Sequence, residues 1–176
     1  KYNTKMNMEI NPSEYKILIV DDVMSNVLLL KVLLTNEKFA IATANNGRQA
    51  LEQVDKERPD LLLLDVMMPD LSGFEVAQRL KSNPDTADIP IIFLTALNST
   101  TDIVKGFQAG ASDFISKPFN KEELIIRVTH QISLVAAKRI ILNKTEELQR
   151  IIAGRDKLYS VIAHDLRSPM GSIKMV

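Results

Sequence analysis

Residues 61–65 read LLLLD, an unbroken apolar run that ends on an acidic residue and is followed by the turn-forming residues Pro69 and Asp70. Such a run predicts a strand that is buried on both faces, as in a parallel sheet. Polar residues follow three other strand-like runs in the same way, and the complete set is Asp21 with Asp22, Asp65, Thr95 and Lys117. Because the carboxyl ends of parallel strands form the ligand crevice of an open sheet, we expect these side chains to meet in one pocket.

Strand-like and helix-like patterns alternate on both sides of this run. The strand signals cover residues 16–20, 40–44, 61–64, 91–95 and 112–115. Helical patterns lie between them, with start signals at Ser25, Asn46-Gly47 and Ser72-Gly73 and end signals at Arg58-Pro59, Asn83-Pro84 and Gly110. Strands and helices in this order predict an α/β fold with a doubly wound, five-stranded parallel sheet.

The predicted pocket would combine three carboxylates, a hydroxyl and an ammonium group. Carboxylates that lie so close together repel one another, and this arrangement favours the binding of a divalent cation such as Mg²⁺. The lysine ammonium and the threonine hydroxyl suit the oxygens of a phosphoryl group. The residue types alone therefore indicate phosphoryl chemistry.

A long helix is predicted after the last strand, since the chain from Lys121 to Ser168 contains no proline and one glycine, Gly154. Apolar residues recur there in heptads, with Leu134, Ile141, Leu148 and Ile162 at one seam position and Ala137, Ile151 and Leu158 at the other. The charged residues Lys144, Arg155 and Asp165 interrupt the seam. We expect a parallel dimeric coiled coil, and hence a homodimer; a long amphipathic helix that packs on another domain is the alternative.

Composition excludes several classes of function. Lys plus Arg and Asp plus Glu are equal, at 22 each in 176 residues, so nothing global indicates nucleic acid or a membrane surface as a partner. The chain has no cysteine and therefore no disulfide or thiolate chemistry. No apolar run approaches the ~20 residues of a membrane span, and the polar start is unlike a signal peptide. A cytoplasmic location is expected. Because Val176 falls within a stretch with a regular helical pattern, we also expect the chain to be a fragment of a longer protein.

Residues 15–133 resemble the receiver domain of two-component response regulators. The resemblance is carried by residues 61–73, LLLLDVMMPDLSG, and by Val20-Asp21-Asp22, Thr95-Ala96 and Lys117-Pro118-Phe119. It implies a flavodoxin-like receiver over residues 14–133, in which Asp65 accepts a phosphoryl group from a phosphohistidine. The donor would be a histidine kinase or a phosphotransfer protein.

The same resemblance implies roles for the residues around the phosphoacceptor. The implied Mg²⁺ ligands are Asp21, Asp22, Asp65 and the backbone carbonyl of Met67. Lys117 would pair with the phosphoryl oxygens, aimed by a cis peptide bond at Pro118, and the hydroxyl of Thr95 would donate a hydrogen bond to the same group. Thr95 and Phe114 would form a switch pair, although the family often has tyrosine where this chain has Phe114.

Residues 156–169 resemble the H-box of sensor histidine kinases, the segment that carries their phosphorylated histidine. This implies His164 as a phosphohistidine and Asp165 as its neighbouring acid and base. The expected segments are a loose N-terminal stretch at 1–13, a receiver at 14–133, a coiled-coil signalling helix at 134–156 and a truncated H-box at 157–176. No ATP-binding domain is present in the sequence, so the chain alone is not expected to phosphorylate His164.

Two interpretations of function follow, and whether the chain is an enzyme stays open in both. In the first, it is part of a hybrid two-component protein in which phosphorylation of Asp65 switches the long helix and so controls a downstream histidine kinase. In the second, it is a stand-alone response regulator that acts as a dimeric adaptor, with His164 inert. A further possibility is a phosphate sink that draws phosphoryl groups from an unrelated kinase. A haloacid-dehalogenase-like phosphatase is disfavoured, because that family has an aspartate where this chain has Met67. Nucleotide-binding folds are disfavoured because their glycine motifs are absent.

Overall fold

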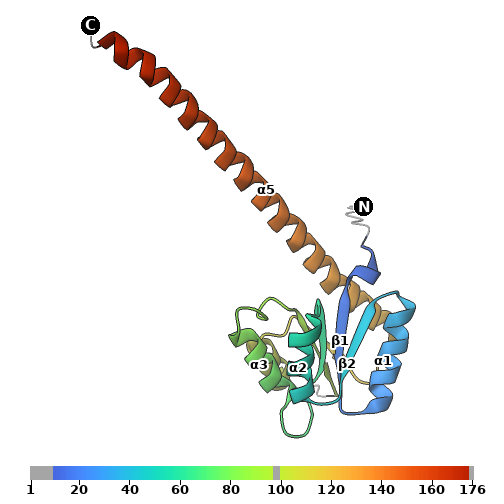
Figure 1. The fold of residues 1–176 in the computed structure, drawn as a ribbon. Helices are drawn as coiled ribbons and strands as arrows, with labels where there is room; N and C mark the ends of the chain where they lie inside the picture. The colour runs from blue at the N-terminus through green and yellow to red at the C-terminus, as the bar shows by residue number, and fades with distance from the viewer. Residues whose placement is uncertain (1–9, 97–99, 175–176) are drawn as a thin grey trace. The chain divides into compact units, whose positions relative to one another are not determined.

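A five-stranded parallel sheet lies at the centre of the first of two compact units, Lys1–Val135 and Ala136–Val176 (Figure 1). The computed structural model describes residues 10–96 and 100–174, and only the backbone from residue 165 onward. The strands are β1 (Lys16–Val20), β2 (Ala40–Ala44), β3 (Leu61–Asp65), β4 (Ile91–Thr95) and β5 (Asp113–Ser116). The helices are η1 (Pro12–Glu14), α1 (Met24–Asn36), α2 (Gly47–Glu57), α3 (Gly73–Ser82), α4 (Thr100–Gln108) and α5 (Lys121–Lys174).

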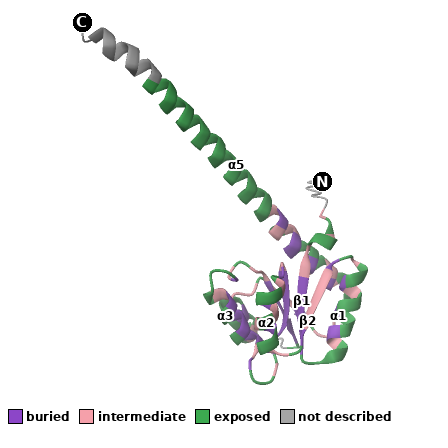
Figure 2. Cartoon of the chain, in the orientation of Figure 1, coloured by how far each residue is buried: buried purple, intermediate pink, exposed green. Residues whose placement is uncertain are grey.

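The strand order is β2-β1-β3-β4-β5, which confirms the predicted doubly wound α/β fold. Alternate side chains of each strand enter two separate cores, because successive residues point to opposite faces of a sheet. Leu18, Leu64 and Phe93 pack with the buried residues of α2 and α3 on one face. Ile19 and Leu63 pack on the other face with buried residues of α1 and of the first turns of α5. The apolar runs of the central strands are therefore covered on both sides, as Figure 2 shows.

The predicted strand boundaries agree with the structure to within one residue. Every residue of β3 and β4 is buried, and the predicted ranges are reproduced apart from the addition of Asp65 to β3. The edge strand β5 begins one residue later than predicted, at Asp113, and only Ile115 of its four residues is buried. The other edge strand, β2, has a single buried residue, Ala44, and still begins and ends where predicted, so burial alone does not decide how well the limits of a strand are predicted.

Three helix signals are confirmed by hydrogen bonds at the helix ends. The side chain of Asn46 accepts a bond from the Gln49 amide at 2.9 Å, and that of Ser72 accepts one from the Glu75 amide at 3.3 Å, so both residues are N-caps. Gly110 has a φ of 101° beyond the C-terminus of α4. Its amide and the next donate to the carbonyls of Phe107 and Gly106, the pattern of a Schellman cap.

The prediction that Ser25 caps the first helix is wrong. Helix α1 begins at Met24 with Val23 in the N-cap position, and Ser25 already lies in the first turn. The carboxylate of Asp21 accepts the amide hydrogen of Val23 at 2.9 Å. An acidic side chain from the loop between β1 and α1 therefore satisfies a donor at this helix start.

Helix α5 spans Lys121–Lys174 and so includes the whole predicted stretch from Lys121 to Ser168 and continues past Pro169. In the first unit its residues Leu124, Val128 and Ile132 are fully buried against the sheet. In the second unit every residue from 138 to 164 is exposed (Figure 2). None of the helices within the described ranges is long and apolar enough to cross a membrane. Of the predicted loose segment 1–13, residues 1–9 lie outside the described residues, and Pro12 begins η1.

Candidate functional site

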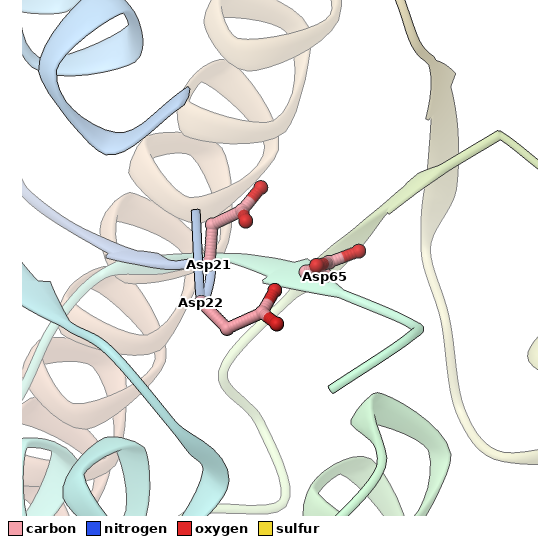
Figure 3. Close-up of side chains that lie close together, drawn as sticks. All are labelled: Asp21, Asp22 and Asp65. Atoms are coloured by element: carbon pink, nitrogen blue, oxygen red, sulfur yellow. The ribbon is translucent and has the colours of Figure 1, made fainter. Parts of the chain in front are cut away.

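Three aspartates gather where β1 and β3 end (Figure 3). Strands β1 and β3 are neighbours, with Val20 opposite Leu64, so the residues that follow them are adjacent in space. Asp21, Asp22 and Asp65 each bring a carboxylate oxygen into a group whose members all lie within 4.8 Å of one another. Asp21 is fully buried and Asp65 is 3% exposed, whereas Asp22 is open to solvent. The predicted acidic cluster is therefore present.

Lys117 lies between two of these carboxylates. Its Nζ is 3.1 Å from Oδ2 of Asp21 and 3.1 Å from Oδ1 of Asp65. The backbone amide of Lys117 donates to the carbonyl of Thr95 at 2.9 Å, which places the lysine across the end of β4. The peptide bond between Lys117 and Pro118 is cis, as predicted. One ammonium group thus partly neutralises two buried carboxylates.

Burial and like charge make Asp65 an unusual carboxyl group. Desolvation and, next in size, the charge of Asp21 together raise its pKa from 3.8 to about 6, against the lowering effect of Lys117. Burial alone would lower the pKa of Lys117, but its hydrogen bonds to Asp65 and Asp21 outweigh that effect and raise it. At pH 7 Lys117 is therefore cationic, and the carboxyl of Asp65 is mostly ionised although it is held in an unfavourable site.

Asn26 belongs to this site but was missed by the sequence analysis. Its side-chain amide donates to Oδ2 of Asp21 at 3.2 Å, while the Val23 amide donates to Oδ1 of the same carboxylate. These bonds and the positive end of the α1 dipole stabilise a buried negative charge. The available signal was a polar residue directly before the apolar segment 27–30.

Gly73, at the start of α3, brings the loop after Asp65 close to the sheet. A Cβ atom at this position would collide with the backbone carbonyl of Asp65 and would lie 2.9 Å from the Cα of Val66. The Gly73 amide donates to the carbonyl of Val66 at 3.0 Å. Met67, in the same loop, has a side chain that is 67% exposed. The predicted role of its backbone carbonyl as a metal ligand stays a prediction.

Thr95 and Phe114, the predicted switch pair, lie on the neighbouring strands β4 and β5. Thr95 ends β4 and is 6% exposed, and Phe114 of β5 pairs in register with Phe93. The half-buried ring of Phe114 lies 5.7 Å from the ring of Phe93 and 4.9 Å from that of Phe107 in α4. A Cβ atom on Gly106 would collide with this ring, so α4 has a glycine where Phe114 packs.

The second predicted phosphoryl site consists of His164 and Asp165. His164 is an exposed residue of α5 in the unit Ala136–Val176. The side chain of Asp165, its predicted acid and base, lies outside the described residues. The role of both residues stays a prediction.

The donor set of the first site fits a small, hard divalent cation. Mg²⁺ is bound by one or two carboxylates together with substrate phosphate oxygens and retained waters. Two buried carboxylates and one exposed carboxylate within 4.8 Å supply such ligands and leave a side open to solvent. Lys117 adds a positive charge that can pair with a transferred anion. The arrangement is chemically suited to receive a phosphoryl group on a carboxylate.

Comparison with known proteins agrees with this reading. The family model for the response regulator receiver domain matches residues 17–129. Response regulator PleD of Caulobacter vibrioides is 42% identical over 140 residues, which cover 80% of this chain and 30% of PleD. DNA-binding response regulator MtrA of Mycobacterium tuberculosis is 42% identical over 113 residues, which cover 48% of MtrA. The chain thus spans less than half the length of these curated relatives.

A solved structure adds a direct parallel for the metal. The receiver domain of sensor histidine kinase PA1611 from Pseudomonas aeruginosa, 28% identical, superposes with a TM-score of 0.63 over 68% of this chain and 98% of that domain. In that structure a magnesium ion is coordinated in the active-site cleft. With the family model matching well over half of its residues, the chain belongs to the response regulator receiver domain family.

Proposed function

We propose that this chain is a phosphorelay receiver in which Asp65 accepts a phosphoryl group from a phosphohistidine. The observation that carries the proposal is the position of Asp65 at the end of β3, 3% exposed, with Lys117 Nζ at 3.1 Å. A carboxylate is a recognised covalent acceptor of phosphoryl groups. The donor would be a histidine kinase or a histidine-containing phosphotransfer protein.

In the transfer step, an Oδ atom of Asp65 attacks phosphorus in line with the leaving imidazole. The O–P bond of an acyl phosphate forms while the P–N bond of the donor breaks, and the bonding pair returns to the imidazole nitrogen, which takes up a proton. Lys117 donates hydrogen bonds to the phosphoryl oxygens. Its ammonium group, which pairs with Asp65 before the transfer, then pairs with the new phosphoryl group. Preorganised charge of this kind is usually the largest contribution to such a rate.

The residues that would hold Mg²⁺ are Asp21, Asp22 and Asp65, with the backbone carbonyl of Met67. When bound, the cation would neutralise charge on the acceptor and on the transferred group. Asn26 and the Val23 amide hold the carboxylate of Asp21 in place from α1, at 3.2 and 2.9 Å. That support keeps one ligand oriented in the absence of the metal.

Thr95 and Phe114 would report the phosphorylation state. In the proposed switch, the Thr95 hydroxyl bonds the acyl phosphate, and the Phe114 ring changes its packing between β4 and α4. The contacts of this ring with Phe93, Phe107 and the Cβ-less Gly106 support a defined packing that can shift as a unit. A ligand-driven change between two packings is a population shift.

The phosphoacceptor is tested by incubating the chain with Mg²⁺ and acetyl phosphate and following intact mass. One phosphoryl adduct is expected in the parent chain and none in Asp65→Asn. Asp70→Asn is the matched control, since Asp70 lies in the following loop outside the acidic cluster and has a φ of 67° that asparagine tolerates. An adduct that persists in Asp65→Asn would refute the assignment.

We further propose that α5 carries the signal to a histidine kinase through a parallel coiled coil. Seam residues of the predicted heptads are exposed, with Ile141 at 64%, Leu148 at 59% and Ile151 at 51%. A row of exposed apolar residues at heptad spacing supports pairing with a second copy of the chain. His164 and Asp165 would then belong to the phosphoacceptor helix of the complete kinase.

The coiled coil is tested by the oligomeric state in solution, measured by light scattering after size exclusion. A dimer is expected for the parent chain and a monomer for Leu148→Asp, while Gln149→Asp, one residue along on the polar side, stays dimeric. A monomeric parent chain at all concentrations would rule out the homodimer. Labelling of His164 by ATP in the complete protein separates the kinase from the adaptor, in which His164 is inert.

A further inference from the structure

One carboxylate joins the switch strand to the long helix. Oδ1 of Asp113, the first residue of β5, accepts the amide hydrogen of Phe114 at 2.8 Å. The same oxygen and Oδ2 each lie 2.9 Å from Nη1 of Arg127 in α5. The side chain of Asp113 therefore contacts the backbone of the proposed switch residue and a guanidinium of α5 together.

Arg127 is held in a defined orientation by a second partner. Its Nε donates to Oε1 of Glu123, one turn earlier in α5, at 3.1 Å. Hydrogen bonding to Asp113 is the main reason why the pKa of Arg127 is raised. Charge-assisted bonds to a planar guanidinium are directional, so a shift of the Asp113 carboxylate is resisted by α5 itself.

Strand β5 is one of the two edge strands of the sheet. It is an edge strand that pairs only with β4 among the described strands, and three of its four residues are not fully buried. The Phe114 ring packs on Phe93 and on α4, where Gly106 leaves room for it. Phe114 is thus linked to α4 through its ring and to α5 through its amide, by way of Asp113.

We infer that the pair of Asp113 and Arg127 is the positioning device that couples a change at Phe114 to α5. This inference rests on the proposed phosphorylation switch and names the contact that passes it on. A displacement of the Phe114 backbone moves the Asp113 carboxylate, which carries Arg127 and the first turns of α5 with it. Neither residue touches the phosphoryl pocket, so phosphorylation of Asp65 itself does not require the pair.

The competing explanation is that the pair merely anchors α5 to the sheet. Apolar contacts already provide that anchor, because Leu124, Val128 and Ile132 are 0% exposed. The Arg127 and Asp113 side chains are 39% and 26% exposed, where an ion pair adds little to stability. A purely structural pair would change thermal stability, whereas a coupling pair changes the response of α5 to phosphorylation.

The test is hydrogen exchange of the α5 amides at residues 121–135, with and without Mg²⁺ and acetyl phosphate, with intact mass recorded on the same samples. In the parent chain, phosphorylation is expected to change the protection of these amides by about fivefold or more, the lower end of typical coupling factors. In Asp113→Asn, whose amide oxygen still accepts from Phe114, and in Arg127→Lys, this change is expected to be lost while the mass adduct forms as before. Glu122→Gln, an exposed neighbour on α5, is the matched control and keeps the response.

The possible outcomes separate the two proposals. If the parent chain forms no adduct, the proposed receiver function fails and the coupling inference falls with it. If the adduct forms and both variants show the full response of α5, the inference is overturned and the receiver function stands. If a variant loses cooperative thermal unfolding, Arg127→Gln replaces it, because this substitution removes the charge of Arg127 and leaves the hydrogen bond from Phe114 to Asp113 in place. A full response of α5 in Arg127→Gln overturns the coupling, and loss of the response supports it.

Discussion

The acidic pocket and the exposed length of α5 show two ways in which polar and apolar groups depart from their usual places. In the pocket, Asp21 and Asp65 are charged groups in the interior, at 0% and 3% exposure. On α5, Ile141 and Leu148 are apolar groups in solvent, at 64% and 59%. Both arrangements are unfavourable for an isolated chain, and each is expected to be relieved by a binding event, of a cation and phosphoryl group in one case and of another helix in the other.

The sharpest contrast lies within α5 itself and concerns Leu124. This side chain is fully buried under the sheet. Leu124→Ala should therefore lower the free energy of unfolding by about 2–5 kcal/mol, the usual cost of emptying a buried leucine site. Chemical denaturation monitored by circular dichroism measures the change. A loss below about 1 kcal/mol would show that the first turns of α5 are not part of the folded core.

Removing the ammonium group should damage the chemistry of the pocket more than its fold. Lys117→Met keeps the length of the side chain but leaves two carboxylates without their shared cation. The rate of phosphorylation by acetyl phosphate is expected to fall on the order of 100-fold, as when one preorganised stabilising group is lost. Lys105→Met serves as the control, because the Nζ of Lys105 lies over the Phe74 ring at 5.0 Å. Equal rates in Lys117→Met and the parent chain would contradict the assigned role.

The cost of the buried carboxylate predicts a substitution that stabilises the protein. The pKa of Asp65 is raised from 3.8 to about 6, so the folded state holds the proton more tightly than the unfolded state. Stability is therefore lost as pH rises from about 4 to about 6, and the penalty is complete at pH 7. In metal-free buffer at pH 7, Asp65→Asn should raise the free energy of unfolding by about 1–3 kcal/mol.

Thermal unfolding at several pH values checks this prediction and its sign. The advantage of Asp65→Asn over the parent chain should shrink as pH falls toward 4, where both side chains are neutral. Added Mg²⁺ should also reduce the difference in stability between Asp65→Asn and the parent chain, because it stabilises the parent chain by binding its carboxylates. An advantage that does not depend on pH would point to a cause other than the charge of Asp65.

The smallest effect is expected on the exposed part of α5. Leu148→Ala removes as many atoms as Leu124→Ala does, but from a side chain that is 59% exposed. For the first unit, the free energy of unfolding should change by less than about 0.5 kcal/mol. Sedimentation over a range of protein concentrations should instead reveal weaker self-association. If neither stability nor association changes, Leu148 is outside any interface that the chain forms with itself.

Local sequence was sufficient to predict the central strands, because an unbroken apolar run indicates a strand that is buried on both faces. Strands β1, β3 and β4 are apolar runs, and their carboxyl ends carry the residues that the topology then brings together. Asp21, Asp65, Thr95 and Lys117 could be placed in one pocket because parallel strands share an orientation. The Asn46 and Ser72 caps could be found because each contacts an amide only three residues away.

Other features depend on contacts between different elements, even where the two residues are only a few positions apart in the chain. Asn26 matters because its side chain reaches the carboxylate of Asp21. Ser25 is not the cap because α1 already begins at Met24, where the Asp21 carboxylate accepts the amide hydrogen of Val23. Gly73 and Gly106 are required by the Asp65 carbonyl and the Phe114 ring, which approach them across the fold. The bond from Arg127 to Asp113 spans 14 residues. Sequence patterns report which residues are apolar or turn-forming, whereas close approaches and ion pairs arise only when the packed sheet and helices bring their side chains together.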